Sequence, residues 1–170
     1  MSRLISYQIP SGYVLDRVVP TGAEIACGVT QGWLSPGDAV AIAVEKLDRG
    51  CLLTPPEERL ALLLADDLDE VPALVSELVV GYEPTELRER LWLFLALDWL
   101  ADHRGDFEDP YEVIEMLYAD FDYTDEIAGL VRWMPMAEGG STGLAAINER
   151  WQSYLDSTRA VYAARGKEAC

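Results

Sequence analysis

The sequence predicts an all-α protein: a single-domain bundle of about seven or eight helices, preceded by a short extended N-terminal segment. Three observations favour this fold class. Helix start signals, in which a capping Ser, Thr or Asp precedes a proline, recur along the chain. Apolar residues follow these signals at spacings of about three and four, the period of a helix. A chain of 170 residues suits one domain, so we expect one helical domain over 1–170.

The first half of the chain has a strand-like pattern only within its first 20 residues, and helix signals follow one another after that. Thr21, Ser35 and Thr54 are the expected N-caps, and Gly28 and Gly50 are the expected stops of the first two helices. We predict helices over 22–28, 36–49 and 55–64, and a further helix over 67–81 that Asp67 or Asp69 opens.

The second half contains the longest strong helix signal, which begins at Pro84 and runs to Asp102. Its residues are apolar on nearly every side between Leu91 and Leu100, so we expect it to be the most buried element. Asp109 is the expected N-cap of the next helix. We predict further helices over 110–120, 124–131 and 142–164.

Acidic residues outnumber basic ones by 30 to 13, and the excess is concentrated in the middle of the chain. Residues 66–126 hold 19 acidic residues and three arginines, out of a formal net charge of −17 for the whole chain. A surface without a basic patch does not neutralise phosphates, which excludes nucleic acid and anionic membranes as partners. The acidic segment either serves solubility alone or forms an electronegative face that attracts a basic partner protein.

The sequence carries no membrane or secretion signal. No apolar run approaches the roughly 20 residues of a membrane helix, and Pro10 interrupts the N-terminal stretch. The cysteines, Cys27, Cys51 and Cys170, are odd in number and widely spaced, so they predict no disulfide framework. We therefore expect a cytoplasmic protein, with Cys27 buried and Cys170 at an exposed chain end.

Candidate catalytic and metal-binding residues are few. His103, the only histidine, lies in a polar loop without a nucleophile motif around it, so we interpret it as an exposed loop residue. The carboxylates of 120–126 lack the glycine and the closing glutamate of an EF-hand calcium loop. Glu112 and Glu115 lack the Glu-x-x-His pattern of a di-iron site. We therefore predict no catalytic residue, no metal site and no cofactor.

The residues that we expect to contact a partner are acidic, with one tyrosine among them. The five tryptophans are most simply interpreted as core, but an aromatic side chain left exposed beside carboxylates would serve as an interface anchor. The candidate partner-binding residues are Asp106, Glu108, Asp109, Asp122, Tyr123, Asp125 and Glu126.

Several blocks of the sequence resemble a known bacterial family. The block YADFDYTDEI at 118–127, followed by VRWMP at 131–135, is similar to the domain-of-unknown-function family twenty-two forty-seven (DUF2247). GWLS at 32–35 and DFEDP at 106–110 resemble its upstream blocks, so the resemblance covers about residues 20–155. Thr124 stands where the family has proline, and threonine caps helices well. The family has no established activity, and the resemblance implies a protein similar in kind to the small cytoplasmic immunity proteins encoded beside bacterial toxins.

We expect a non-enzymatic immunity protein that binds and neutralises a cognate bacterial toxin. Because a nuclease toxin must be basic to hold its substrate, an acidic inhibitor would cover that surface and exclude nucleic acid. The alternative is a non-catalytic helical scaffold or adaptor whose charge serves only solubility. A third interpretation is an enzyme with a carboxylate-bound metal ion.

Overall fold

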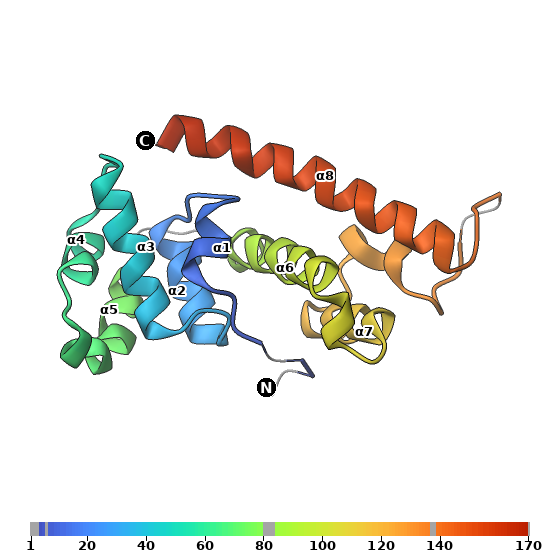
Figure 1. Cartoon of the computed structure of the whole chain (residues 1–170), viewed down its shortest axis with the longest axis horizontal. Coiled ribbons are helices and arrows are strands. Elements are labelled where there is room, and N and C mark those ends of the chain that lie inside the picture. Colours follow the sequence, from blue (N-terminus) through green and yellow to red (C-terminus); the bar gives the residue numbers. More distant parts are fainter. Residues whose placement is uncertain (1–3, 6, 80–83, 137–138, 170) are drawn as a thin grey trace. The chain divides into compact units, whose positions relative to one another are not determined.

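The computed structural model describes residues 4–5, 7–79, 84–136 and 139–169 of the chain. Helices are the regular secondary structure of this part of the chain, which confirms the predicted all-α class (Figure 1). They are, in chain order, α1 Ser11–Leu15, α2 Gly22–Gln31, α3 Pro36–Asp48, α4 Pro55–Ala61, the 3-10 helix η1 Ala65–Glu70, α5 Val71–Glu77, α6 Thr85–Asp102, the 3-10 helix η2 Arg104–Asp106, α7 Pro110–Asp120, the 3-10 helix η3 Asp125–Leu130 and α8 Leu144–Ala169.

Backbone contacts divide the chain into two compact units, which we describe separately. Unit 1 comprises Met1–Ser6 and Leu93–Arg159, and unit 2 comprises Tyr7–Trp92 and Ala160–Cys170. The division falls inside α6 and α8, so each of these helices contributes one part to each unit. The expectation of one domain over 1–170 stays a prediction.

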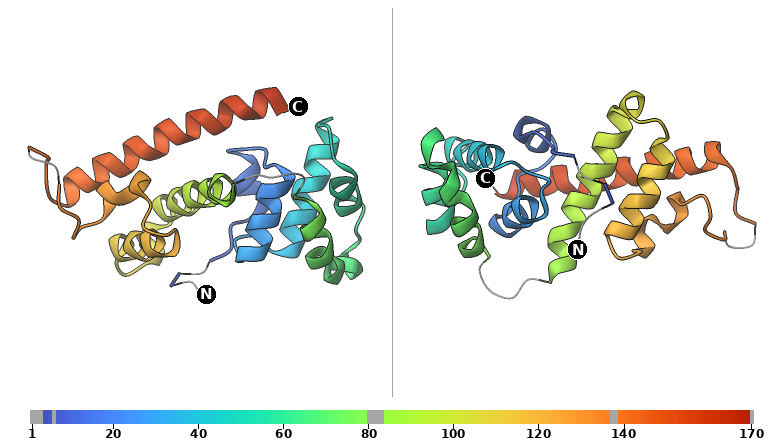
Figure 2. Two further views of the ribbon diagram at one scale, coloured as in Figure 1. Left: turned by 180° about the vertical axis from the view of Figure 1, so that it is seen from behind. Right: turned by 90° about the horizontal axis from the view of Figure 1, so that it is seen from below.

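The N-caps predicted for unit 2 are confirmed. The Thr21 and Glu24 side chains form a capping box at the start of α2, and the Ser35 hydroxyl accepts a backbone N–H at the start of α3. Thr54 caps α4 together with Glu57, whose carboxylate accepts the Thr54 N–H at 2.8 Å. α3 contacts α1 and α4, and α2 contacts α5, so these short helices pack around a common core (Figures 1 and 2).

The predicted stop of α2 at Gly28 is wrong, because this glycine serves packing rather than termination. α2 continues to Gln31, and Gly32 ends it with a φ of 82°. A Cβ atom at Gly28 would lie 2.3 Å from the Trp92 indole, so only glycine leaves room for that ring. The Trp92 indole N–H donates to the Glu24 carbonyl at 2.8 Å, which fixes the ring against α2.

Three other segments of unit 2 differ from the predictions. The strand-like first 20 residues contain a short helix, α1, which starts directly after Pro10. The helix predicted over 55–64 ends at Ala61, and Leu64 is exposed rather than buried. The helix predicted over 67–81 divides into η1 and α5, with Pro72 in the first turn of α5, and the predicted end at Gly81 lies outside the described residues.

Unit 1 is organised around the second part of α6. Every residue from Leu93 to Asp98 is buried, as are Leu91 and Trp92 of unit 2, which agrees with the prediction of a highly buried helix. The one charged residue of this segment, Asp98, forms an ion pair with Arg159 of α8. α7 contacts η3 (Figure 2), and their apolar residues Val113, Ile114, Leu117, Ile127 and Leu130 are buried. In the part of α8 that belongs to unit 1, Ile147, Trp151 and Leu155 are buried and Leu144 is exposed.

Candidate functional site

The seven predicted partner-binding residues all belong to unit 1 and flank α7 at both ends. Asp106 ends η2, and Glu108 and Asp109 precede the first turn of α7. Residues 122–126 follow its last turn and lead into η3. A helix of 11 residues is about 16 Å long. The structure therefore arranges the predicted residues in two groups rather than in one.

Asp109 is engaged within the protein at the N-terminal end of α7. Its carboxylate accepts the Tyr111 backbone N–H at 3.0 Å and forms an ion pair with Arg132, with 2.8 Å between Oδ2 and Nη1. Arg132 also pairs with Glu115 through its Nε, at 2.8 Å. The hydrogen bond from Arg132 holds the pKa of Asp109 below its ordinary value, and Glu115 and Asp109 in turn raise the pKa of Arg132.

The turn after α7 has a left-handed backbone at two consecutive residues. Asp122 and Tyr123 both have a φ of 55°, a conformation that residues other than glycine rarely adopt. The Tyr123 N–H donates to the Tyr118 carbonyl at 2.8 Å, which closes the end of α7. The side chains of Asp122 and Tyr123 are exposed, as are those of Asp125 and Glu126 in the first turn of η3.

Three aromatic side chains lie together beside this turn, and we call Tyr118, Tyr123 and Trp133 the aromatic cluster. Tyr118 is buried, whereas Tyr123 and Trp133 are 60% and 59% exposed. Both exposed rings pack edge-to-face on Tyr118, with ring centroids 5.2 Å and 5.9 Å away. The interpretation of Trp133 as core is wrong. The signal that locates it is the non-helical VRWMP turn at 131–135, where no helical period directs the indole inward.

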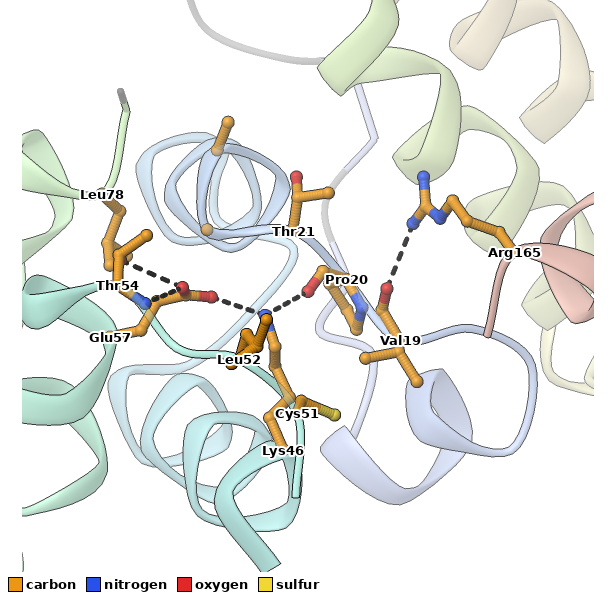
Figure 3. A pocket seen from close by; sticks show the side chains of 12 residues that line it. Val19, Pro20, Thr21, Lys46, Cys51, Leu52, Thr54, Glu57, Leu78 and Arg165 are labelled. Carbon is orange, nitrogen blue, oxygen red and sulfur yellow. Dashed lines mark hydrogen bonds and ion pairs between the residues drawn. The ribbon is translucent and has the colours of Figure 1, made fainter. Parts of the chain in front are cut away.

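Unit 2 contains a cavity of about 370 Å³ that no sequence motif predicts (Figure 3). Apolar atoms dominate its walls, to which Pro20, Leu52 and Leu78 contribute. The Lys46 ammonium and the Glu57 carboxylate also line it, and both side chains are buried. Lys46 Nζ lies 2.5 Å from Glu57 Oε1 and 2.8 Å from the Pro20 carbonyl oxygen (Figure 3).

The charged groups around this cavity are paired with one another. Burial opposes ionisation of Glu57, but hydrogen bonds from Lys46 and Thr54 outweigh it and hold the pKa of the carboxyl below its ordinary value. Arg165 donates to both carboxylate oxygens of Glu24, at 2.8 Å and 2.7 Å, and more weakly to the Val19 carbonyl. These contacts join α3 to α4 and α8 to α2, so we interpret the charges of the cavity as structural.

His103 is half-buried rather than exposed. Its ring stacks on Trp99, with centroids 3.7 Å apart, and its Nδ1 lies 2.8 Å from the Trp99 carbonyl oxygen.

Within the described part of the chain, no group of three or more His, Cys, Asp or Glu side chains is arranged to hold a metal ion. None of the described helices is both long enough and apolar enough to cross a membrane. Cys27 is buried, as predicted. Cys51 is disulfide-bonded, so the expectation that the cysteines form no disulfide is wrong. Cys170 lies outside the described residues.

The fold and this surface define an acidic, all-α protein with exposed aromatic and carboxylate side chains in one unit. The chain belongs to a bacterial family: the model of the family described as "Uncharacterized protein conserved in bacteria (DUF2247)" matches residues 11–159. This match confirms the resemblance seen in the sequence blocks. No curated protein and no solved structure matches the chain significantly.

Proposed function

We propose that this chain is a cytoplasmic immunity protein that binds and neutralises a cognate bacterial toxin of basic, nuclease type. The toxin binds exposed residues at both ends of α7 in unit 1, which we call the acidic face: Asp106, Glu108, Asp122, Tyr123, Asp125 and Glu126. The observation that carries this proposal is the distribution of charge. Residues 105–131 contain nine acidic residues and neither lysine nor arginine, and every member of the acidic face is exposed. Asp109 is left out because it pairs with Arg132.

Two residues of the acidic face lie where they cost folding free energy. A left-handed backbone at Asp122 and Tyr123 costs on the order of 1–3 kcal/mol for each residue. Asp122 also follows the C-terminal end of α7, where the helix dipole favours cations over carboxylates. Local costs of this kind are common at sites kept for recognition. They support a role in binding a partner.

A nuclease toxin is the class of partner that this charge fits. Such a toxin needs a cationic surface to hold phosphates, and an anionic protein bound there excludes the substrate by occupying the same groups. Complementary charge also raises the rate of association by about 10- to 1,000-fold at low salt. Fast capture matters to an inhibitor because the toxin acts until it is bound.

The test is co-expression of the chain with each toxin domain encoded beside its gene, followed by measurement of growth and of binding kinetics. We expect one of these toxins to be neutralised and to form a complex whose association slows steeply as salt rises. If none of them is bound or neutralised, the proposal is wrong and the scaffold or adaptor interpretation takes its place.

A matched pair of variants locates the surface. The first removes four charges from the acidic face, through Asp106→Asn, Glu108→Gln, Asp122→Asn and Asp125→Asn. The control removes four from η1 in unit 2, through Asp66→Asn, Asp67→Asn, Asp69→Asn and Glu70→Gln. We expect the first variant to slow association by about tenfold or more and the control to change it by about twofold at most. Equal slowing in both would show that only net charge matters.

A further inference from the structure

We infer that the aromatic cluster receives an arginine side chain of the partner protein. This inference rests on the proposed function for the identity of the partner, and it adds which type of partner side chain the cluster binds. Tyr123 and Trp133 expose more than half of their surface, although both are held against the buried Tyr118 ring. Large aromatic side chains held rigidly at a surface are the typical anchors of protein–protein interfaces.

The two exposed rings are held in place before a partner binds. Each packs edge-to-face on Tyr118, and the Tyr123 backbone is fixed by its hydrogen bond to the Tyr118 carbonyl. The backbone on the Trp133 side is anchored by its neighbour Arg132, which pairs with two carboxylates of unit 1. A partner that contacts these rings therefore loses little free energy in ordering them.

The charge around the cluster selects a cation. Asp122 precedes Tyr123 in the chain, and Asp125 and Glu126 follow it closely, all with exposed side chains. A guanidinium satisfies both kinds of group, because it stacks on aromatic faces and donates paired hydrogen bonds to carboxylates. A lysine ammonium is more strongly hydrated and has no planar face to stack, so it gains less from the same surface.

Other occupants fit this surface less well. A second copy of the chain would bring two acidic faces together, and like charges in close contact repel each other. An apolar peptide would cover the rings but would also remove water from the neighbouring carboxylates without pairing them, which is costly. Charge complementarity therefore favours a cationic segment of another protein.

The test uses two synthetic hexapeptides of equal net charge, one with four arginines and one with four lysines, titrated into the full chain at low salt. The indole N–H resonance of Trp133, assigned with Trp133→Phe, reports on binding at the cluster. We expect the arginine peptide to shift this resonance and to bind about two- to fivefold tighter for each ring it contacts. Equal affinity for the two peptides, or no shift at Trp133, would overturn the inference.

Variants separate the rings from the charge. We expect Tyr123→Ala and Trp133→Ala each to reduce the preference for arginine and to leave the weaker binding of the lysine peptide in place. We expect Asp125→Asn to lower the affinity for both peptides, and Asp69→Asn in η1 serves as the charge-matched control. If the preference for arginine survived the loss of both rings, the cluster would not be the site that binds arginine. If sedimentation showed self-association that Trp133→Ala abolishes, a second copy of the chain would be the occupant of the cluster.

The outcomes distinguish this inference from the proposed function. A toxin that is neutralised through the acidic face by a chain with no preference for arginine would overturn only the arginine anchor. A clear preference for arginine at Trp133, with no neighbouring toxin bound, would overturn the immunity function and leave a surface that recognises arginine-bearing proteins.

Discussion

The two units carry almost the same net charge and use it differently. Unit 1 contains 14 acidic and 5 basic residues, and unit 2 contains 16 and 8. In unit 2, Glu24 and Glu57 are buried, and each both caps a helix and pairs with a cation from another helix. In unit 1, the side chains of the acidic face are exposed at both ends of α7, and the group after α7 lies beside the aromatic cluster. Net charge therefore does not separate buried structural carboxylates from exposed ones, whereas burial does.

A buried ion pair is a poor source of stability but a strong constraint on structure. Removing two charges from water costs several kcal/mol for each ion, and good geometry returns about the same amount. Loss of one partner leaves an unpaired charge that nothing compensates. We therefore expect unit 2 to be sensitive to single substitutions of its paired charges, and the acidic face to be insensitive.

The largest effect is expected at the Lys46–Glu57 pair. Glu57→Gln leaves the Lys46 ammonium buried without its carboxylate, and we expect it to lower the free energy of unfolding by about 3–5 kcal/mol. The double variant Lys46→Met with Glu57→Gln removes the unpaired charge and should recover most of that loss. Urea denaturation of the three proteins measures both effects. A loss below about 1 kcal/mol for Glu57→Gln would show that water reaches the pair.

Gly28→Ala is expected to have the next largest effect. The added methyl group would overlap the Trp92 indole, and overpacking of this kind costs about 1–3 kcal/mol. Gly12→Ala in α1 is the matched control, since a Cβ atom there meets no other atom within 4 Å. The control should be neutral or stabilise by up to about 1 kcal/mol. Thermal unfolding of the two variants decides the point, and equal behaviour would contradict the close packing at Gly28.

These two sites show how far the sequence predicts the structure. Local signals are sufficient for the caps at Thr21, Ser35 and Thr54, because a capping residue and its helix are neighbours in the chain. The prediction at Gly28 is wrong because the sequence does not distinguish a glycine that ends a helix from a glycine that leaves space for a packed indole ring. The pairing of Lys46 with Glu57 depends on the packing of α3 on α4, which no local pattern specifies.

The candidate site was predicted in part. The charge pattern selects the acidic residues around α7, but it does not distinguish Asp109, which caps α7 and pairs with Arg132, from its exposed neighbours. The sequence alone predicts a buried Trp133 because tryptophans are usually buried, and only the path of the turn after η3 places it at the surface.

A smaller effect is expected from pH. The pKa of Glu57 in the folded protein lies below the ordinary value of 4.5, so the folded state favours its charged form. The stability that this carboxylate contributes is complete above the unfolded-state value, and it is lost as pH falls through the lowered folded-state pKa. The difference in unfolding free energy between the wild type and Glu57→Gln should therefore be constant near neutral pH and shrink below about pH 4.5. A difference that stays constant down to pH 3 would mean that the charge of Glu57 contributes nothing.

The smallest effect on stability is expected where the effect on binding is largest. The fourfold variant of the acidic face removes exposed charges that repel one another, so its unfolding free energy should stay within about 0.5 kcal/mol of the wild type or rise slightly. Urea denaturation at low and at high salt measures this, and any gain should disappear at high salt because the repulsion is then screened. A loss of several kcal/mol would mean that these carboxylates hold unit 1 together as Glu57 holds unit 2. The contrast between the units would then fail, and slower association of the variant with a toxin would reflect unfolding rather than a lost contact surface.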